Sequence, residues 1–421
     1  MDDRFIAYKI LSKIERDKAY SNIAVDTIIS QNDVSSAPFV CALVYGVIER
    51  KITLDYYLSQ FLSQPLKKLN PQVLTILRMG AYQLKFMDKV PVSAAVNESV
   101  KLSKKVKCAF ASSLINSVLR RISTEEISLP NSNNKIYDLS IAYSCPEVLV
   151  EHFVNDYGYI KAEEILKASL GAVPVFLRVN TLKTTHEELI DILANEGIVT
   201  KSLGNGTTLE VVNGGAVFKT EAYKNGYFHA QDLASQDCIT NLAPKKNDIV
   251  FDMCAAPGGK SFTMAQMMGN QGKVYSFDLY DHKIKLINDG AKRLGIDIIK
   301  AQICDASVYN PDLPKADKIL CDVPCAGLGV IRRKPEIKYK DFGFVDKLCE
   351  LQYNILENSA LYLKEKGVIM YSTCSLSNKE NTEICRRFLE EHKDFKNGGM
   401  VTMFPHEKGS DGFFYATLIR E

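Results

Sequence analysis

The sequence lacks several features that would assign it to common classes of protein. No apolar run approaches the ~18 residues that a membrane span requires, and the N-terminal region is charged where a signal peptide would be apolar. None of the eleven cysteines forms a C-x-x-C pair, so no zinc or other metal site is expected. The net charge of only +2 gives no general attraction for polyanions. We therefore expect a cytoplasmic protein without a membrane or metal partner, in which any nucleic-acid contact comes from a local patch.

The best-defined motif is IVFDMCAAPGGK at 249–260. Apolar residues that read as a buried strand are followed by small residues and two glycines, and then by a helical pattern. Such a turn exposes backbone N–H groups to a ligand because no side chains stand in the way. The dinucleotide fingerprint G-x-G-x-x-G is absent, and Cys254 stands where a phosphate loop has its first glycine. The turn therefore predicts a different nucleotide-like ligand.

Residues 1–128 read as an all-helical domain. Apolar residues such as Phe5, Ile6 and Ile10 recur at helical spacing, and Asn70-Pro71 has the form of a helix start. The stretch 101–121 contains six basic residues and no acidic ones: Lys101, Lys104, Lys105, Lys107, Arg120 and Arg121. This run is either a solvated helix face or a patch that binds phosphates.

Two further regions precede the glycine motif. Residues 129–140 are polar and asparagine-rich, which indicates a linker. Within 141–225 we expect a helix over 146–169, a strand over 175–180, a helix near 187–195 and a turn-rich β stretch. This pattern predicts a small α+β domain that is too short to be an enzyme by itself.

Strands and helices alternate over 226–421. Strands are expected near 248–253, 273–278, 298–303, 317–322 and 367–372, with a closing strand near 412–418. This alternation predicts an α/β domain built on a doubly wound, mainly parallel sheet.

Reactive side chains recur at the carboxyl ends of these strands, where such sheets bind ligands. They are four carboxylates and two thiols: Asp252, Asp278, Asp305, Asp322, Cys325 and Cys374. Asp278 stands where a ribose-binding acid belongs, and Asp305 is placed to meet an adenine. No complete phosphate loop accompanies them. A cofactor with ribose and adenine but no phosphate fits best, and S-adenosylmethionine is such a cofactor.

The two cysteines indicate a reaction class. Carbon C5 of cytosine is not nucleophilic enough to attack a methyl sulfonium directly, but addition of a thiolate to C6 makes C5 an enamine. The C5 proton must then leave so that the thiol can be eliminated. Two thiols at one site, Cys325 and Cys374, fit a nucleophile and a base.

Several motifs together resemble the bacterial 16S ribosomal RNA (cytosine-C5)-methyltransferases of the Sun/Fmu (RsmB) type, in the RsmB/NOP family. They are DMCAAPGGK (252–260), DVPCAGLGVIRRKPEIK (322–338), STCSL (372–376), FHAQDLASQ (228–236) and DGFFYA (411–416). ILRMGAYQL (76–84) and VPVSAAVNESVKLSKK (90–105) resemble the NusB-type helical domain of this subfamily. The resemblance covers essentially the whole chain. One departure is Ala326, where relatives often have a serine.

The resemblance implies a Rossmann-like methyltransferase domain over 226–421, preceded by a NusB-like RNA-binding domain (1–128) and an RNA-recognition-like domain (141–225). It implies that S-adenosylmethionine is bound by Cys254, Ala255, Ala256, Pro257, Gly258, Gly259, Lys260, Asp278, Asp305 and Asp322. Cys374 is implied as the nucleophile, Cys325 as the residue that assists product release, and Asp322 as a hydrogen-bond partner of cytosine N3. The implied substrate is 16S rRNA, free or in a small-subunit particle, and we take the enzyme to be a monomer.

Several alternatives stay open at this point. The enzyme could methylate tRNA or another rRNA site, or could use Cys325 as the nucleophile. The chain could instead be a non-catalytic NusB-like RNA-binding factor, although the two cysteines and the glycine turn argue against this. An NTPase is possible only if the missing first glycine is dispensable. Arg332, Arg333 and Lys334 are either RNA-phosphate contacts or a solvated loop.

Overall fold

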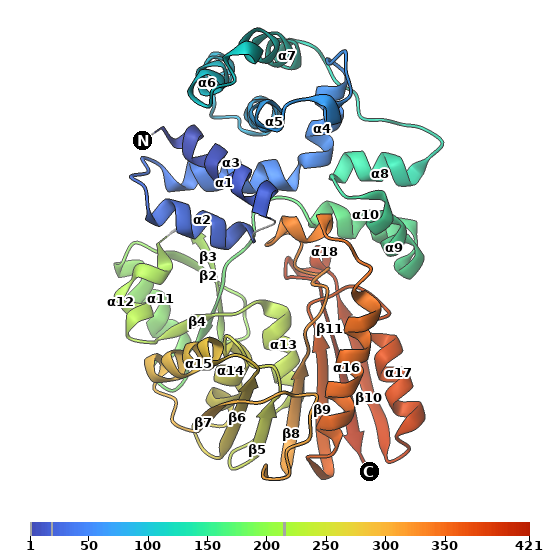
Figure 1. Ribbon diagram of the computed structural model, residues 1–421. Helices are drawn as coiled ribbons and strands as arrows, with labels where there is room; N and C mark the ends of the chain where they lie inside the picture. The colour runs from blue at the N-terminus through green and yellow to red at the C-terminus, as the bar shows by residue number, and fades with distance from the viewer. Residues whose placement is uncertain (1, 18–19, 214–215) are drawn as a thin grey trace. The chain divides into compact units, whose positions relative to one another are not determined.

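The computed structural model of the chain describes residues 2–17, 20–213 and 216–421 (Figure 1). The chain forms two compact units. The first comprises Met1–Gly171 together with Ile331–Lys340, and the second comprises Ala172–Val330 together with Asp341–Glu421. No helix among the described residues is long and apolar enough to cross a membrane.

The first unit is a bundle of helices: those up to Thr124 share one apolar core, and the last three pack on one another and against the helix Lys51–Ser59. The helices are α1 (Asp3–Asp17), α2 (Ser21–Ser30), α3 (Ala37–Glu49), α4 (Lys51–Ser59), α5 (Pro71–Phe86), α6 (Val92–Lys105), α7 (Ser112–Thr124), α8 (Lys135–Tyr143), α9 (Glu147–Tyr157) and α10 (Tyr159–Ala168), with the 3₁₀ turns η1 (Leu66–Lys68) and η2 (Ala109–Ala111). The helix start at Asn70-Pro71 is confirmed, because the Asn70 side chain accepts a hydrogen bond from the Gln72 N–H at 2.9 Å.

The structure differs from two expectations about the middle of the chain. The segment 129–140 is not a linker throughout, because the Asn134 side chain caps α8, which begins at Lys135. The single helix expected over 146–169 is wrong. It is divided into α9 and α10 because Gly158 has a φ of +77° and ends α9. Both helices belong by their contacts to the first unit.

A segment from far along the chain, Ile331–Lys340, completes the first unit. The Glu336 carboxylate accepts hydrogen bonds from the Ser21 N–H (3.1 Å) and hydroxyl (2.8 Å) at the start of α2. The buried Lys338 ammonium donates to two carbonyl oxygens at the ends of α3 and α8, each at 2.7 Å. Burial lowers the pKa of Lys338 to about 8. A lysine at two helix C-termini satisfies carbonyls that have no partner within their helices.

The second unit begins with a small antiparallel sheet of order β2-β3-β1-β4. Its elements are β1 (Phe176–Val179), α11 (His186–Asn195), β2 (Val199–Ser202), β3 (Thr208–Asn213), η3 (Val217–Lys219), α12 (Glu221–Lys224) and β4 (Phe228–Ala230). The strand over 175–180 and the helix near 187–195 are confirmed as β1 and α11. β4, from the FHAQD motif, pairs with β1, and Leu177 stands opposite Ala230. The motif therefore contains the last strand of this sheet, and the chain continues from it toward the larger sheet.

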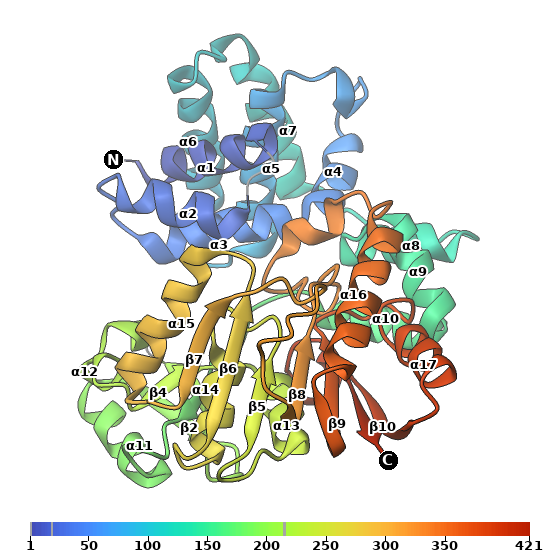
Figure 2. The same cartoon turned by 60° about the horizontal axis from the view of Figure 1, so that its bottom comes forward.

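The large sheet has seven strands in the order β10-β11-β9-β8-β5-β6-β7, and Figure 2 shows β9, β8, β5, β6 and β7 side by side. They are β5 (Ile249–Asp252), β6 (Lys273–Asp278), β7 (Ile299–Ile303), β8 (Ala316–Asp322), β9 (Leu363–Thr373), β10 (Phe395–Met403) and β11 (Phe413–Arg420). The five strands expected up to residue 372 are confirmed, and all pair in parallel. The strand expected last is β11, which runs antiparallel to β9 and β10 and lies between them. β10 was not expected, because Gly398 and Gly399 at its centre weaken the strand pattern.

Helices cover both faces of the large sheet, so the doubly wound arrangement is confirmed. On one face lie α13 (Leu233–Leu242), α14 (Gly259–Met267) and α15 (Asp281–Leu294), and on the other α16 (Val345–Ala360) and α17 (Thr382–Glu391), while the short α18 (Pro405–Lys408) precedes β11. Neighbouring strand residues alternate between two cores: Val250 packs with the first group of helices and Phe251 with the second. The candidate site lies where β5, β8 and β9 end.

Candidate active site

The glycine-rich turn between β5 and α14 forms one wall of the site. The predicted strand, turn and helix are confirmed, because β5 ends at Asp252 and α14 begins at Gly259. Gly258 has a φ of +107°, and a Cβ there would lie 2.5 Å from the Phe262 ring, so only glycine fits. The Gln231 side-chain amide donates to the Gly259 carbonyl at 3.2 Å and holds the start of α14 in place.

A cavity of about 220 Å³ opens beside this turn. It is lined by Ala230, Gln231, Asp232, Ser235, Asp252, Ala255, Ala256, Pro257, Gly259, Lys260 and Asp322. The last six are residues that the sequence predicts to bind a cofactor, whereas the predicted Cys254, Gly258, Asp278 and Asp305 do not line the cavity. Gln231, Asp232 and Ser235 were not predicted, although the FHAQDLASQ motif that contains them was a usable signal.

Lys260 and Asp322 form an ion pair in the cavity wall. The Lys260 ammonium lies 2.6 Å from Asp322 Oδ2, and the Ser372 hydroxyl donates to Asp322 Oδ1 at 2.9 Å. Burial alone would lower the pKa of Lys260, but the neighbouring Asp322 carboxylate outweighs burial and raises it. Lys260 therefore stays charged and fixes the Asp322 carboxylate at the end of β8.

Asp252 also lines this cavity, and only one of its two carboxylate oxygens has a hydrogen-bond partner among the described residues. Its Oδ2 accepts a hydrogen bond from the Ser261 hydroxyl at 2.6 Å, but Oδ1 is buried without a partner among the described residues. Burial raises the pKa of Asp252 to about 7. A buried acceptor without a donor is costly, so Asp252 is suited to a ligand that supplies a donor or a positive charge.

Asp278 and Asp305 lie further along the same sheet edge. The Asp278 carboxylate is nearly buried at the end of β6, with the Lys283 ammonium at 3.3 Å. Two exposed apolar side chains flank it: Leu279 follows it, and Ile303 stands opposite it on β7. The exposed Asp305 accepts hydrogen bonds from the Ser307 N–H and hydroxyl at 2.9 and 2.6 Å, as a turn cap does.

The two thiols meet directly. Cys325 follows β8 and Cys374 follows β9, and because these strands are parallel neighbours, the two Sγ atoms come within 3.1 Å. The hydrogen bond with Cys374, together with burial, raises the pKa of Cys325 well above its usual range. A thiol at this distance can donate a hydrogen bond to the other sulfur, and such a donor favours the thiolate form of the sulfur that accepts it.

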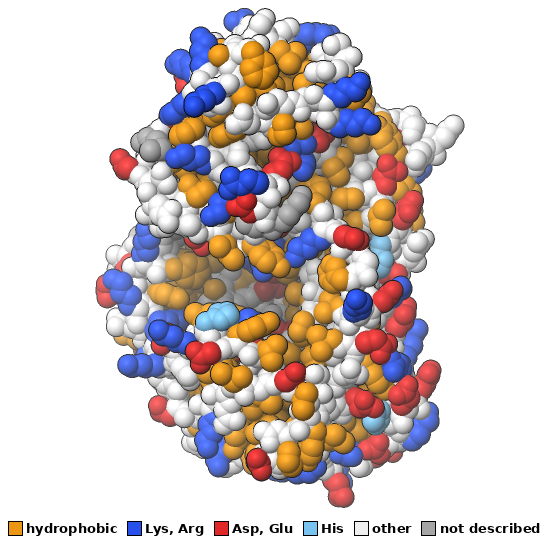
Figure 3. All heavy atoms as spheres, in the orientation of Figure 1, with side chains coloured by type: hydrophobic (Ala, Val, Ile, Leu, Met, Phe, Trp, Pro, Cys, Tyr) orange, Lys and Arg blue, Asp and Glu red, His pale blue; other side chains and the backbone are white. Residues whose placement is uncertain are grey.

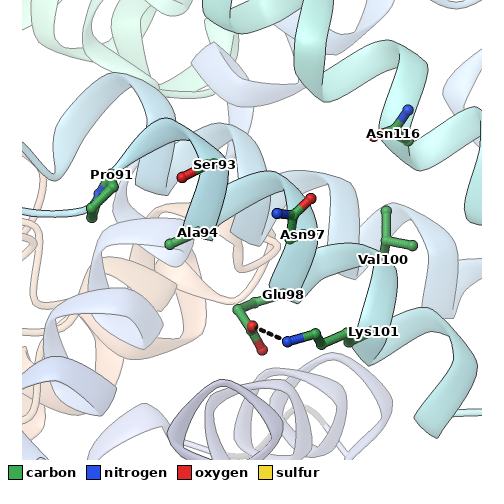
Figure 4. A pocket seen from close by; sticks show the side chains of 8 residues that line it. All are labelled: Pro91, Ser93, Ala94, Asn97, Glu98, Val100, Lys101 and Asn116. Carbon is green, nitrogen blue, oxygen red and sulfur yellow. Dashed lines mark hydrogen bonds and ion pairs between the residues drawn. The ribbon is translucent and has the colours of Figure 1, made fainter.

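The first unit has a hollow of its own, between α6 and α7. It has a volume of about 440 Å³ and is lined by Pro91, Ser93, Ala94, Asn97, Glu98, Val100, Lys101 and Asn116. Figure 4 shows the polar side chains of α6 and α7 around this hollow and the ion pair between Lys101 and Glu98, whose atoms are 2.7 Å apart.

We define the α6–α7 surface as the six basic residues of 101–121 together with Phe110. Phe110, in η2 between the two helices, is 75% exposed. Four of the basic residues have contacts within the unit, with Glu98, the Phe5 ring, Asn116 and Glu125, whereas Lys104 and Lys107 have no ion-pair partner among the described residues. Figure 3 shows Lys and Arg side chains interspersed with exposed hydrophobic ones at the α6–α7 end of the unit.

Arg332, Arg333 and Lys334 belong to the first unit with the rest of Ile331–Lys340. The two arginines are half-buried and Lys334 is exposed. Their contact with RNA stays a prediction. No group of three or more His, Cys, Asp or Glu side chains that could hold a metal ion occurs in the described part of the chain.

Three family profiles match successive parts of the chain. The 16S rRNA methyltransferase RsmB/F family matches residues 239–419, and the NusB family matches residues 1–124. The ferredoxin-like domain of RsmF/B-like methyltransferases matches residues 145–209. The NusB assignment is therefore confirmed, and the middle region is of the ferredoxin-like kind.

Individual relatives extend over nearly the whole chain. The probable ribosomal RNA small subunit methyltransferase B of Bacillus subtilis (strain 168) is 36% identical over 438 residues, covering 99% of this chain and 98% of that protein. The protein of the same name from Synechocystis is 32% identical over 440 residues, with 99% and 98% covered.

Solved structures share the fold. The crystal structure of PH0851 matches with a TM-score of 0.82 at 26% identity and covers 99% of both chains. NSun6 of Pyrococcus horikoshii, solved with SFG, has a TM-score of 0.61 at 24% identity and covers 65% of this chain and 98% of that one. Because the relatives match from end to end, the chain belongs to the RsmB/F family of 16S rRNA methyltransferases.

Proposed function

We propose that the protein transfers a methyl group from S-adenosylmethionine to C5 of a cytosine in 16S rRNA, through a covalent bond between Cys374 and cytosine C6. The observation that carries the proposal is the 3.1 Å separation of the Cys325 and Cys374 sulfur atoms. Methylation of an amino group or a hydroxyl does not require two thiols in contact. Methylation of C5 requires one group that bonds to carbon and a second that accepts the C5 proton.

Three features suit S-adenosylmethionine as the methyl donor. The unpartnered Asp252 oxygen can accept a hydrogen bond from the cationic amino group of the amino-acid part. Asp278 stands on the next strand, where ribose hydroxyls can donate to its carboxylate. Leu279 and Ile303 offer exposed apolar surface beside Asp278 for the adenine ring. When bound, the cofactor supplies an electrophilic methyl group.

The thiols and Asp322 then have distinct tasks. The Cys374 thiolate forms a bond to C6, and electron density moves toward C5 as N3 takes a proton from water. Asp322 accepts a hydrogen bond from this N3–H, and the proton returns to water when the ring is restored. After C5 has gained the methyl group, Cys325 releases its own thiol proton to water, and the resulting thiolate takes the C5 proton. The electron pair of that C–H bond expels the Cys374 sulfur and restores the aromatic ring. A thiol with a high pKa gives a strongly basic thiolate, which suits Cys325 to this step.

The α6–α7 surface supports RNA as the substrate. Its basic side chains can pair with phosphates, and the exposed Phe110 ring can stack on an unpaired base. In this proposal the first unit holds rRNA, while the thiols of the second unit carry out the chemistry.

The proposal is tested by labelled methyl transfer. Full-length protein is incubated with methyl-labelled S-adenosylmethionine and either 16S rRNA or small-subunit particles, and the RNA is digested to nucleosides. We expect labelled 5-methylcytidine with the wild-type protein and none with Cys374→Ala. Cys41→Ala, which removes a half-buried thiol of the first unit, is the matched control and should retain activity. Label in tRNA alone would favour a tRNA substrate, and no label in any RNA would favour a non-catalytic RNA-binding factor.

A further inference from the structure

The turn before α17 carries a buried carboxylate that has no role in the scheme above. Glu380 is completely buried, and the donors that meet its oxygens among the described residues are neutral groups. Taking a charged carboxylate out of water without a cation beside it is costly unless its oxygens are well satisfied. The groups to which Glu380 is hydrogen-bonded should therefore explain why a carboxylate is buried at this position.

The Glu380 carboxylate connects the two loops that carry the thiols. Its Oε1 accepts hydrogen bonds from the Ala326 N–H at 2.8 Å and from the Gln352 side-chain amide at 3.0 Å. Its Oε2 accepts a hydrogen bond from the Ser375 hydroxyl. Ala326 is the residue after Cys325, and Ser375 is the residue after Cys374. One carboxylate thus holds the neighbour of each thiol.

Two amide side chains secure the other side of each thiol. Gln352 of α16, besides bonding to Glu380, donates to the Pro324 carbonyl at 2.8 Å, directly before Cys325. Asn381 accepts a hydrogen bond from the Thr373 hydroxyl at 2.6 Å, directly before Cys374. The residues on both sides of each thiol are therefore anchored to α16 or to the turn that contains Glu380: Pro324 and Ala326 through their backbone, Thr373 and Ser375 through their hydroxyls.

We infer that Glu380 is a positioning residue that fixes the separation of Cys325 and Cys374. The inference deepens the proposed function and rests on it, because only a reaction with two thiols requires that separation. Glu380 acts through the backbone N–H of Ala326 and the hydroxyl of Ser375. Both of its oxygens are engaged by these contacts, so the carboxylate orients the loops and carries no proton for the reaction.

Length, rather than charge, is the property that this role requires. Glutamine has the length of glutamate, and its oxygen can accept from Ala326 and Gln352 while its amide donates to the Ser375 oxygen. Aspartate keeps the charge but is one methylene shorter, so it cannot reach both loops. Glu380→Gln should therefore preserve the thiol geometry, and Glu380→Asp should lose it as Glu380→Ala does.

Disulfide formation between the two thiols measures their separation without RNA. Full-length protein is treated with diamide, which gains two electrons and two protons as two thiols become one disulfide. The Cys325–Cys374 linked peptide is then quantified by mass spectrometry after the remaining thiols have been alkylated. We expect Glu380→Ala and Glu380→Asp to form this disulfide at least about tenfold more slowly, since effective concentration falls steeply with misplacement. Glu380→Gln should react at close to the wild-type rate.

Controls separate positioning from a loss of folding. Glu390→Ala removes an exposed carboxylate from α17 and should react like the wild type. Thermal unfolding and binding of S-adenosylhomocysteine report whether each variant is folded. A folded Glu380→Ala variant that forms the disulfide at the wild-type rate would overturn the inference. If that variant does not fold, equal rates for Glu380→Asp and Glu380→Gln would overturn it. Absence of rRNA methylation would count against the proposed function but would leave the thiol measurement valid.

Discussion

Gly329 and Gly412 meet backbone to backbone beside the thiols. The Gly412 N–H donates to the Gly329 carbonyl at 2.8 Å, and the Gly329 N–H donates to the Cys374 carbonyl at 2.9 Å. A Cβ on Gly329 would lie 1.9 Å from the Gly412 carbonyl oxygen, a distance that no side chain tolerates. The DGFFYA motif thus contacts the loop after Cys325, and that loop contacts the residue that bears the second thiol.

Gly329→Ala should therefore damage both stability and activity. The added methyl group must push the loop away from Gly412 and Cys374, and overpacking of this kind costs roughly 1–3 kcal/mol. Urea unfolding measures the loss of stability, and labelled methyl transfer measures the activity. Gly343→Ala is the matched control, because a Cβ there would lie 3.4 Å from its nearest neighbour. Equal stability of the two variants would contradict the close contact at Gly329.

The two cysteines should give opposite results in a covalent trapping assay. If Cys374 attacks C6, Cys374→Ala should form neither 5-methylcytosine nor a protein–RNA adduct. Cys325→Ala should still attack and methylate, but it should stall before elimination, because no thiolate accepts the C5 proton. A protein–RNA species should then persist on a denaturing gel. An adduct in Cys374→Ala and none in Cys325→Ala would reverse the two roles.

The protonation of Asp252 should make both stability and cofactor affinity depend on pH. In the unfolded chain an aspartate releases its proton near pH ~4, whereas in the folded protein Asp252 keeps its proton up to about pH 7. Because the folded pKa is raised, this site destabilises the ligand-free protein progressively as the pH rises through that window, and the cost is complete above it. Asp252→Asn should therefore gain more stability over the wild type at pH 8 than at pH 4.

Urea unfolding of the ligand-free proteins at both pH values tests this expectation. S-adenosylhomocysteine, which carries the same amino group as the methyl donor, should bind the wild type more tightly at pH 8 than at pH 6, because only ionised Asp252 pairs with a cation. Asp252→Asn should bind more weakly and without that dependence. A pH-independent affinity in the wild type would show that Asp252 does not contact the ligand.

The α6–α7 surface should determine how RNA affinity depends on salt. Replacing Lys104, Lys105 and Lys107 by alanine should weaken rRNA binding and reduce the slope of log affinity against log salt by about 2, since each phosphate contact contributes roughly 0.7–0.9. S-adenosylhomocysteine affinity should not change. The matched control replaces Lys67, Lys68 and Lys89, which are exposed lysines of the same unit. An unchanged slope for the first variant would identify its lysines as a solvated face.

Much of this fold can be predicted from short stretches of sequence, because an apolar run and the turn residues after it specify where a strand lies and where it ends. β6 occupies 273–278, as expected, and the meeting of Cys325 and Cys374 follows once each is placed at the end of a strand and the strands pair. Gly158 and β10 were missed, because one glycine divides a helical pattern and two others weaken a strand pattern. Hydrophobic periodicity therefore predicts secondary structure least well at glycines.

Partners that come from distant parts of the chain could not be predicted. Glu380 reads as one acidic residue near a helix start, and only the fold brings it to Ala326. The unpartnered oxygen of Asp252 likewise depends on burial by other elements, which the sequence does not display. The cofactor roles of Cys254, Gly258, Asp278 and Asp305, which lie outside the cavity, stay predictions, because a strand end specifies an edge of the sheet and not a position along it.

The segment Ile331–Lys340 has a consequence for how the chain is synthesised. Helices α2, α3 and α8 are all translated before residue 171, but Glu336 and Lys338, which complete their ends, follow far later. At roughly 5–20 residues per second, the delay is on the order of ten seconds. The N-terminal unit therefore cannot reach its final form as it emerges, and it must wait until most of the second unit has been made.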